Sequence, residues 1–243
     1  MRRGLIAFGA MLMAMTTEAQ TDLGLWTEAE AQWSLTKKLE AGVEAELRTA
    51  NGLKDVGRWS LGATIDWTPT KWLAAGAGYS LQDSHHPAEE TKKGNMVDEY
   101  WQLRHRIFAQ AKFKTKLTAV RLSLRLRYQL THKRGVSVAK YSSTKTRKDN
   151  EEKEAENDNV LRMRLGLNVK TKSRLAPFAS YELYNDLDDG FAVAKHRISA
   201  GTEIKVNKRN ALEVGYARNI FSGSDDDDQK THNAILLGYK LNF

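Results

Sequence analysis

V-R-L-S-L-R-L-R-Y-Q-L-T, residues 120–131, is the stretch of sequence that decides the fold. From Val120 to Leu130 every second residue is apolar or aromatic, and the residues between them are arginine, serine or glutamine. A period of two is the repeat of a β-strand, whose successive side chains point to opposite faces. In a helix, which turns by about 100° per residue, the arginines would interrupt every apolar stripe. The stretch therefore predicts a strand with one apolar face and one arginine-rich face.

The same alternation returns along most of the chain. The further segments that show it are residues 24–35, 39–48, 58–67, 72–81, 100–113, 159–170, 175–185, 195–205, 211–220 and a last segment ending at Phe243. The connections between them alternate in length, from two to five residues and from roughly eight to twenty-five. Short turns at one end and long loops at the other are typical of a transmembrane β-barrel. We therefore expect an all-β fold, a single antiparallel transmembrane barrel of ten to twelve strands with short periplasmic turns and long extracellular loops.

The first 19 residues have the pattern of a signal peptide. Arg2 and Arg3 form a basic start, a mostly apolar run follows from residue 4 to residue 15, and Ala19 offers a small residue for cleavage. The apolar run is too short to span a bilayer. We expect cleavage after residue 19, so that residues 20–243 form the barrel.

Composition excludes several other classes of protein. The chain has no cysteine, so disulfides and a lipoprotein anchor are excluded. After the signal peptide no run of 18 apolar residues occurs, but hydropathy is blind to transmembrane strands. A formal charge of +8 often indicates nucleic-acid binding. Here an exported chain spreads its charges between apolar residues, and we expect no nucleic-acid partner.

The strand count is eleven, whereas bacterial single-chain barrels have an even number. We therefore expect that one element is misassigned: either the first strand does not span the membrane, or a strand lies hidden in a loop, for instance at residues 136–143. Otherwise residues 133–158, which are dense in lysine and glutamate and lack a period, are predicted to be a mobile solvated loop.

Aromatic residues near strand ends predict the two girdles that barrels place at the membrane interfaces. These are Trp33, Trp59, Trp67, Trp72, Trp101, Phe113 and Tyr239.

The signal peptide, the early pattern of a tryptophan-bearing strand, the Lys37-Lys38 turn and an acidic strand, and the final strand ending in Phe243 resemble an outer-membrane barrel family of Gram-negative bacteria. This family is common in Bacteroidetes and has only a domain-of-unknown-function label. The resemblance implies an outer-membrane location and contact with lipid and lipopolysaccharide. It also implies recognition of the last strand, at Tyr239, Leu241 and Phe243, by the barrel-assembly machinery. It implies no activity.

The polar faces turn into the lumen if the apolar faces meet lipid, because a barrel strand has only two faces. A turn near residues 115–116 sets two pairs of arginines opposite each other, Arg104 with Arg127 and Arg106 with Arg125. We call the arginines expected on this side the arginine wall: Arg104, Arg106, Arg121, Arg125, Arg127, Arg162 and Arg164. Glu30, Glu44 and Glu46 form a glutamate wall at the same level.

Two interpretations of these walls remain open at this point. In a narrow barrel the long side chains meet across the lumen, and a salt-bridge network closes it. In a wider barrel the walls stand apart, and the field between them selects small charged solutes, with the arginines favouring anions. The first predicts a plugged barrel that acts structurally or binds through its outer loops, and the second predicts a narrow pore.

Two further classes of protein are compatible with an exported β-rich chain, a lipid hydrolase and a soluble carrier. An outer-membrane lipid hydrolase would need a serine, histidine and carboxylate site, but no hydrolase motif or zinc-ligand spacing occurs, so we name no catalytic residue, metal or cofactor. His85, His86, His132 and His232 lie in or beside loops, and His105 and His196 fall on the lipid-facing side. A secreted soluble carrier would place the apolar faces inside and the arginines in water.

Overall fold

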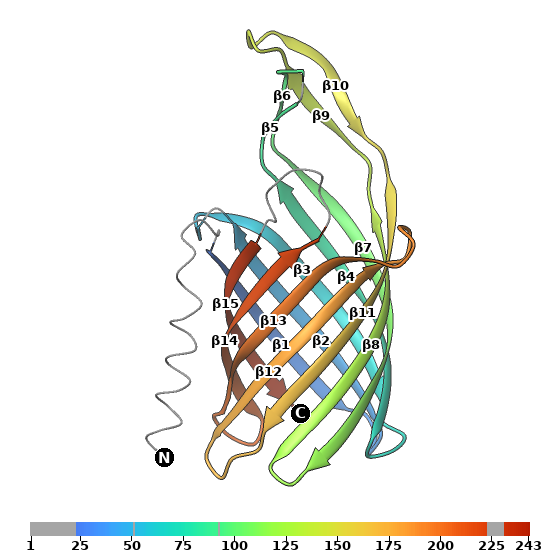
Figure 1. The fold of residues 1–243 in the computed structure, drawn as a ribbon, viewed down its shortest axis with the longest axis vertical. Helices are drawn as coiled ribbons and strands as arrows, with labels where there is room; N and C mark the ends of the chain where they lie inside the picture. Colours follow the sequence, from blue (N-terminus) through green and yellow to red (C-terminus); the bar gives the residue numbers. More distant parts are fainter. Residues whose placement is uncertain (1–22, 51, 92, 223–230) are drawn as a thin grey trace.

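A computed structural model describes residues 23–50, 52–91, 93–222 and 231–243, and these form a closed β-barrel with a small sheet beyond one end (Figure 1). The signal peptide predicted for residues 1–19 lies outside the described residues. None of the described residues forms a helix with the length and hydropathy that a membrane span requires. The barrel strands are β1 (Leu23–Ser34), β2 (Leu39–Ala50), β3 (Asp55–Trp67), β4 (Leu73–His86), β7 (Tyr100–Leu117), β8 (Val120–Lys133), β11 (Glu156–Val169), β12 (Leu175–Asp186), β13 (Ala192–Lys205), β14 (Asn210–Phe221) and β15 (Thr231–Asn242).

In the part of the chain that the structure describes, the closed barrel has eleven strands, which confirms the expected range and the count of eleven. The expectation that one element is misassigned is wrong, because an odd barrel closes when its first and last strands run in the same direction. Here β1 pairs with β15 in parallel, from Leu23 opposite Asn233 to Gln32 opposite Asn242. The backbone N–H of Phe243 donates to the carbonyl of Gln32 at 2.9 Å and extends this seam to the end of the chain.

The connections differ at the two ends of the barrel. At one end, here called the turn end, β1 and β2, β3 and β4, β7 and β8, β11 and β12, and β13 and β14 are joined by two to five residues. The C-terminus lies at this end (Figure 1). The opposite end, the loop end, has the long connections at residues 87–99 and 134–155. Two of its other connections, residues 51–54 and 187–191, are shorter than expected because the flanking strands continue further.

Part of the predicted solvated loop is ordered as a second sheet. Its strands are β5 (Glu89–Glu90), β6 (Met96–Val97), β9 (Val136–Tyr141) and β10 (Arg147–Lys153), in the order β10-β9-β6-β5. The strand suspected at residues 136–143 therefore exists as β9, but it does not belong to the barrel. Val97 and Val138 are buried and give this sheet a small apolar core, a signal that the surrounding charges obscure in the sequence.

The hairpin of β7 and β8 turns later than predicted. Leu117 pairs with Val120, so the turn is residues 118–119, and Thr118 adopts a left-handed φ of 46° that suits a two-residue hairpin turn. The predicted pairs of Arg104 with Arg127 and Arg106 with Arg125 are therefore wrong. Their partners are Lys133 for Arg104, Thr131 for Arg106, Gln110 for Arg127 and Lys112 for Arg125.

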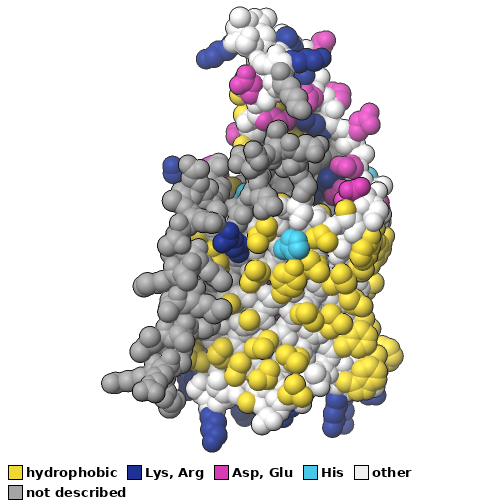
Figure 2. Space-filling model, viewed as in Figure 1, with side chains coloured by type: hydrophobic (Ala, Val, Ile, Leu, Met, Phe, Trp, Pro, Cys, Tyr) yellow, Lys and Arg dark blue, Asp and Glu magenta, His cyan; other side chains and the backbone are white. Residues whose placement is uncertain are grey.

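The two faces of the barrel wall differ as the alternation predicts. On the outer face, Leu165 is 59% exposed and Ile107 is 52% exposed, whereas on the inner face Gln129 is 5% exposed. Figure 2 shows hydrophobic side chains over the wall of the barrel and charged side chains gathered toward its two ends. A surface that is apolar outside and polar inside is the reverse of a soluble carrier and matches a barrel surrounded by lipid.

The aromatic residues divide between the two ends. Trp33, Trp67, Trp72, Phe113 and Tyr239 lie near the turn end, and Trp59 and Trp101 lie toward the loop end. At the turn end the ring of Phe243 stacks on Trp33, with centroids 5.4 Å apart, and Trp72 stacks on Phe113. The last residue of the chain thus packs against the first strand, beside the seam.

Glu151 in the second sheet provides a test of that sheet by pH. Lys140 and Lys153 donate hydrogen bonds to its carboxylate at 2.8 and 2.7 Å, and they lower its pKa from 4.5 to about 2. Because the pKa is lower in the folded state, the stabilisation is present above pH 4.5 and is lost as the pH falls through about 2. We expect a carbon-13 NMR titration of Glu151 to show a midpoint near 2.

The Lys140→Met variant should raise that midpoint toward 4.5, and the control Lys145→Met, in the turn before β10, should leave it unchanged. A midpoint near 4.5 in the wild type would show that this sheet does not form as described.

Candidate functional site

The candidate site is the lumen, where the structure places the predicted arginine wall on β7, β8 and β11. Two pairs of arginines lie directly opposite each other on β8 and β11: Arg127 with Arg162, and Arg125 with Arg164. Arg104 and Arg106 lie closer to the loop end, and Arg121 is exposed near the turn end. Opposed like charges destabilise a sheet unless they find counter-charges or hydrogen bonds elsewhere.

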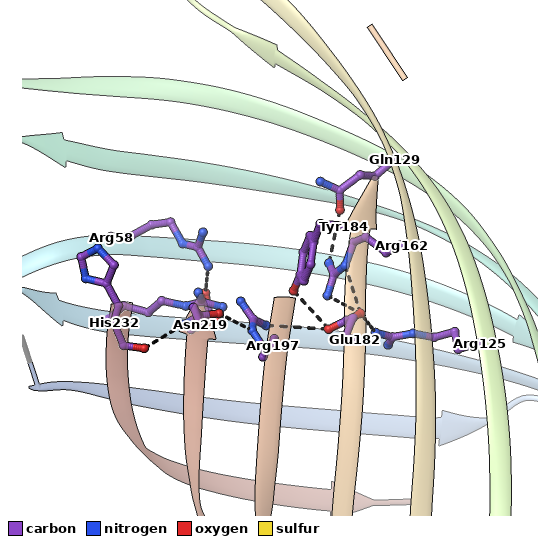
Figure 3. A network of polar contacts seen from close by, with 11 residues as sticks. Arg58, Arg125, Gln129, Arg162, Glu182, Tyr184, Arg197, Asn219 and His232 are labelled. Atoms are coloured by element: carbon purple, nitrogen blue, oxygen red, sulfur yellow. Dashed lines mark hydrogen bonds and ion pairs between the residues drawn. The ribbon is translucent and has the colours of Figure 1, made fainter. Parts of the chain in front are cut away.

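Glu182 on β12 is the counter-charge of the central arginines (Figure 3). It accepts hydrogen bonds from Arg125 at 2.6 Å and from Arg162 at 2.9 Å, and Arg197 lies 4.0 Å away. The hydroxyl of Tyr184 donates to its second oxygen at 3.1 Å. The whole residue is only 2% exposed. We call Glu182 with Arg125, Arg162 and Arg197 the Glu182 cluster.

Glu182 was not among the residues predicted from the sequence to line the lumen. The only signal was its place on the polar face of the segment at residues 175–185, and its partners come from strands far apart in the sequence. Arg197 and Tyr184 were missed for the same reason.

Tyr184 also gives the lumen an aromatic surface for cations. The guanidinium of Arg162 lies 4.6 Å from its ring centroid, and the ammonium of Lys195 lies 3.9 Å from it. Trp26 on β1 is a second aromatic surface for cations. The guanidinium of Arg48 lies 3.9 Å from its ring centroid, and that of Arg197 lies 4.8 Å from it. Because Trp26 and Arg197 lie on β1 and β13, which are not neighbours, side chains meet across part of the lumen at this level.

The glutamate wall lies on β1 and β2, where Glu30 pairs with Glu44 and Glu28 pairs with Glu46. Glu28 was not among the predicted wall residues. Glu46 forms ion pairs of 2.6 Å with both Arg48 and Arg58. The predicted glutamate wall is thus neutralised in part by arginines of its own neighbourhood, on β2 and β3.

Ion pairs do not join the two predicted walls to each other. In the described part of the chain, no carboxylate lies within 4.0 Å of Arg106, Arg127 or Arg164. Arg106 donates to Thr131, and Arg127 donates to Gln110 and stacks on the ring of Phe108. These three arginines therefore keep an uncompensated positive charge inside the barrel.

Part of the lumen leaves room beside its side chains. Glu28 faces inward, between Glu46 on β2 and Gly238 on β15, and is nevertheless exposed. Nearer the turn end, Lys240 pairs with Glu213 at 2.8 Å and with Glu203 at 3.6 Å, and all three side chains are partly exposed. The lumen thus combines partly exposed ion pairs toward the turn end with a densely packed, buried cluster around Glu182.

The described residues hold no group of three or more histidine, cysteine, aspartate or glutamate side chains that could bind a metal ion. His105 and His196 lie on the outer face, where each ring accepts or donates a hydrogen bond of 2.7 Å to a tyrosine hydroxyl, Tyr79 and Tyr181 respectively.

The Glu182 cluster makes a stability prediction. The Glu182→Gln variant leaves three buried arginines without their carboxylate, and we expect it to lower the free energy of unfolding by about 3 to 5 kcal/mol. The control Glu213→Gln removes a more exposed ion pair and should cost about 1 kcal/mol or less. Urea unfolding in lipid vesicles measures both values. Equal losses in the two variants would contradict a central role for Glu182.

Comparisons with known proteins bear on the fold and the family. The beta domain of the Bordetella autotransporter BrkA is 12% identical, with 87% of this chain and 86% of that chain covered and a TM-score of 0.59. The translocator domain of the autotransporter NalP from Neisseria meningitidis is 13% identical, with 95% and 92% covered and a TM-score of 0.53. The NanC porin is 10% identical, with 92% and 100% covered and a TM-score of 0.51.

These likenesses confirm the β-barrel fold. A search of curated proteins finds no match. The family model described as "Protein of unknown function (DUF2490)" matches residues 23–230, which confirms the expected resemblance to an uncharacterised barrel family. The chain belongs to the DUF2490 family of proteins of unknown function.

Proposed function

We propose that the protein resides in the outer membrane, after cleavage of its signal peptide, and forms a narrow pathway for small anions. The apolar outer face, the aromatic residues at both ends and the barrel fold support residence in a lipid bilayer. We infer that the barrel-assembly machinery recognises the last strand, and the stacking of Phe243 on Trp33 beside the seam supports a role of this end in closing the barrel. The loop end would then face the cell exterior and meet lipopolysaccharide.

The observation that carries the pathway is the uncompensated charge of Arg106, Arg127 and Arg164. These arginines project into the lumen, and the exposure of Glu28 supports a lumen that is partly open to water. A low-dielectric wall with a surplus of one sign of charge concentrates the opposite ion. The glutamates of β1 and β2 face these arginines, so the surplus of positive charge is limited to one side of the lumen. A narrow lumen with this arrangement of charge suits small solutes.

A second candidate function rests on the Glu182 cluster. Its carboxylate is almost fully buried, and its arginines come from the nearby strands β8, β11 and β13 (Figure 3). Arg197 also reaches the ring of Trp26 on β1, at 4.8 Å. A layer of this kind favours a plugged barrel that acts through its outer sheet and loops. A measurement of single-channel conductance distinguishes the anion pathway from the plugged barrel.

The test is single-channel conductance of the refolded mature protein in planar bilayers under a potassium chloride gradient. We expect small, steady currents with a reversal potential that favours chloride. The double variant Arg106→Gln/Arg127→Gln removes two uncompensated charges and should lower the ratio of anion to cation permeability severalfold. The matched control Lys208→Gln, at an exposed turn, should keep the wild-type ratio.

A preference for cations in the wild type, or an unchanged ratio in the double variant, would contradict the anion pathway. Silence from a barrel shown to be folded would favour the plugged barrel.

A further inference from the structure

Six cationic side chains from five strands converge at one level of the lumen. Arg48 of β2 and Arg197 of β13 lie 3.9 and 4.8 Å from the ring of Trp26, and Arg162, Lys195 and Arg197 lie 4.6, 3.9 and 5.3 Å from the ring centroid of Tyr184. Arg58 of β3 shares Glu46 with Arg48, and Arg106 of β7 lies close enough to be repelled by Arg48, Arg58 and Arg162. We call this group the cation ring: Arg48, Arg58, Arg106, Arg162, Lys195 and Arg197.

The carboxylates that pair with the ring are too few to balance it. Among the described residues, only Glu46 and Glu182 lie within 4.0 Å of its members. Glu46 is taken up by Arg48 and Arg58, and Glu182 also neutralises Arg125, which lies outside the ring. Six cations with two carboxylates leave a surplus of positive charge in a confined space, where like charges repel strongly.

The ammonium of Lys195 lies between two aromatic rings, 3.9 Å from the ring centroid of Tyr184 and 5.4 Å from that of Phe221. Its Nζ atom forms no hydrogen bond or ion pair with the residues that the structure describes. The Nε atoms of Arg48 and Arg58 are buried and also lack an acceptor among the described residues. Three donor groups of the ring are therefore unused within the described part of the chain.

We propose that the cation ring binds a multiply charged oxyanion, a phosphate group, on its way through the lumen. Guanidinium groups bind phosphate oxygens through paired hydrogen bonds, and a lysine ammonium adds a point charge. A dianion with several acceptor oxygens matches a surplus of several charges and unused donors on different strands better than chloride does. The inference rests on the proposed anion pathway, and it names the class of solute that this pathway would retain.

The phosphate group has two sources, free phosphate or an organic phosphate ester, and two probes distinguish them. Thermal unfolding of the detergent-refolded barrel would be followed with inorganic phosphate, with glycerol 3-phosphate and with sodium chloride at equal ionic strength. We expect phosphate to raise the melting temperature above that in chloride. A larger rise with the ester would identify organic phosphates as the better ligands, and a larger rise with inorganic phosphate would identify the free anion.

Lys195→Met keeps the apolar stem between Tyr184 and Phe221 but removes the charge. We expect it to weaken phosphate binding at least tenfold, as measured by titration calorimetry, whereas the control Lys208→Met keeps the wild-type affinity. Phosphorus NMR of inorganic phosphate with the wild-type barrel is a readout that needs no variant. Exchange broadening is expected, and its absence would overturn the inference.

Conductance and binding together separate this inference from the proposed function. An anion-selective channel that phosphate neither stabilises nor blocks would overturn the phosphate site and leave the pathway standing. A silent barrel that binds phosphate through Lys195 would support the site within a plugged lumen and contradict the pathway. Equal binding by the wild type and the Lys195→Met variant would overturn the site.

Discussion

The structure depends on the closure of a sheet whose strands have only two faces. Closure pairs β1 with β15, and it forces every second side chain into a confined lumen. Alternation of apolar residues with long charged ones therefore places guanidinium and carboxylate groups inside the barrel, where each must find a partner or a solvent molecule. The arrangement of charge in the lumen follows from that requirement.

Partners are found mostly among nearby strands rather than between the two predicted walls. Glu182 serves arginines of β8, β11 and β13, and Glu46 serves arginines of β2 and β3. These compact clusters fill much of the middle of the lumen. Carboxylates are too few for the remaining cations, so a positive surplus persists beside water-accessible glutamates. The proposed anion pathway and the proposed phosphate site both rest on this one imbalance.

Much of the fold could be predicted from the sequence, because a repeat of two residues indicates both a strand and which residues share each of its faces. Residues 120–131 are a strand of the barrel, and all eleven barrel strands were located. The pairing of strands was harder to predict. The turn lies at residues 118–119 rather than near residues 115–116, so the residues opposite Arg104 and Arg106 differ from those predicted. Parallel closure, the small core at Val97 and Val138, and the role of Glu182 all depend on contacts between distant residues, which no local pattern records.

The most direct test of this account is the accessibility of single cysteines on β7, which is possible because the chain has no cysteine of its own. Cysteines would replace Gln110, Ala111, Lys112 and Phe113 in turn, and the variants in lipid vesicles would be treated with a negatively charged thiol reagent. The account predicts that positions 110 and 112 react and that positions 111 and 113 are protected by lipid. Reaction at 111 and 113 with protection at 110 and 112 would show that the arginines face outward, and it would contradict the account.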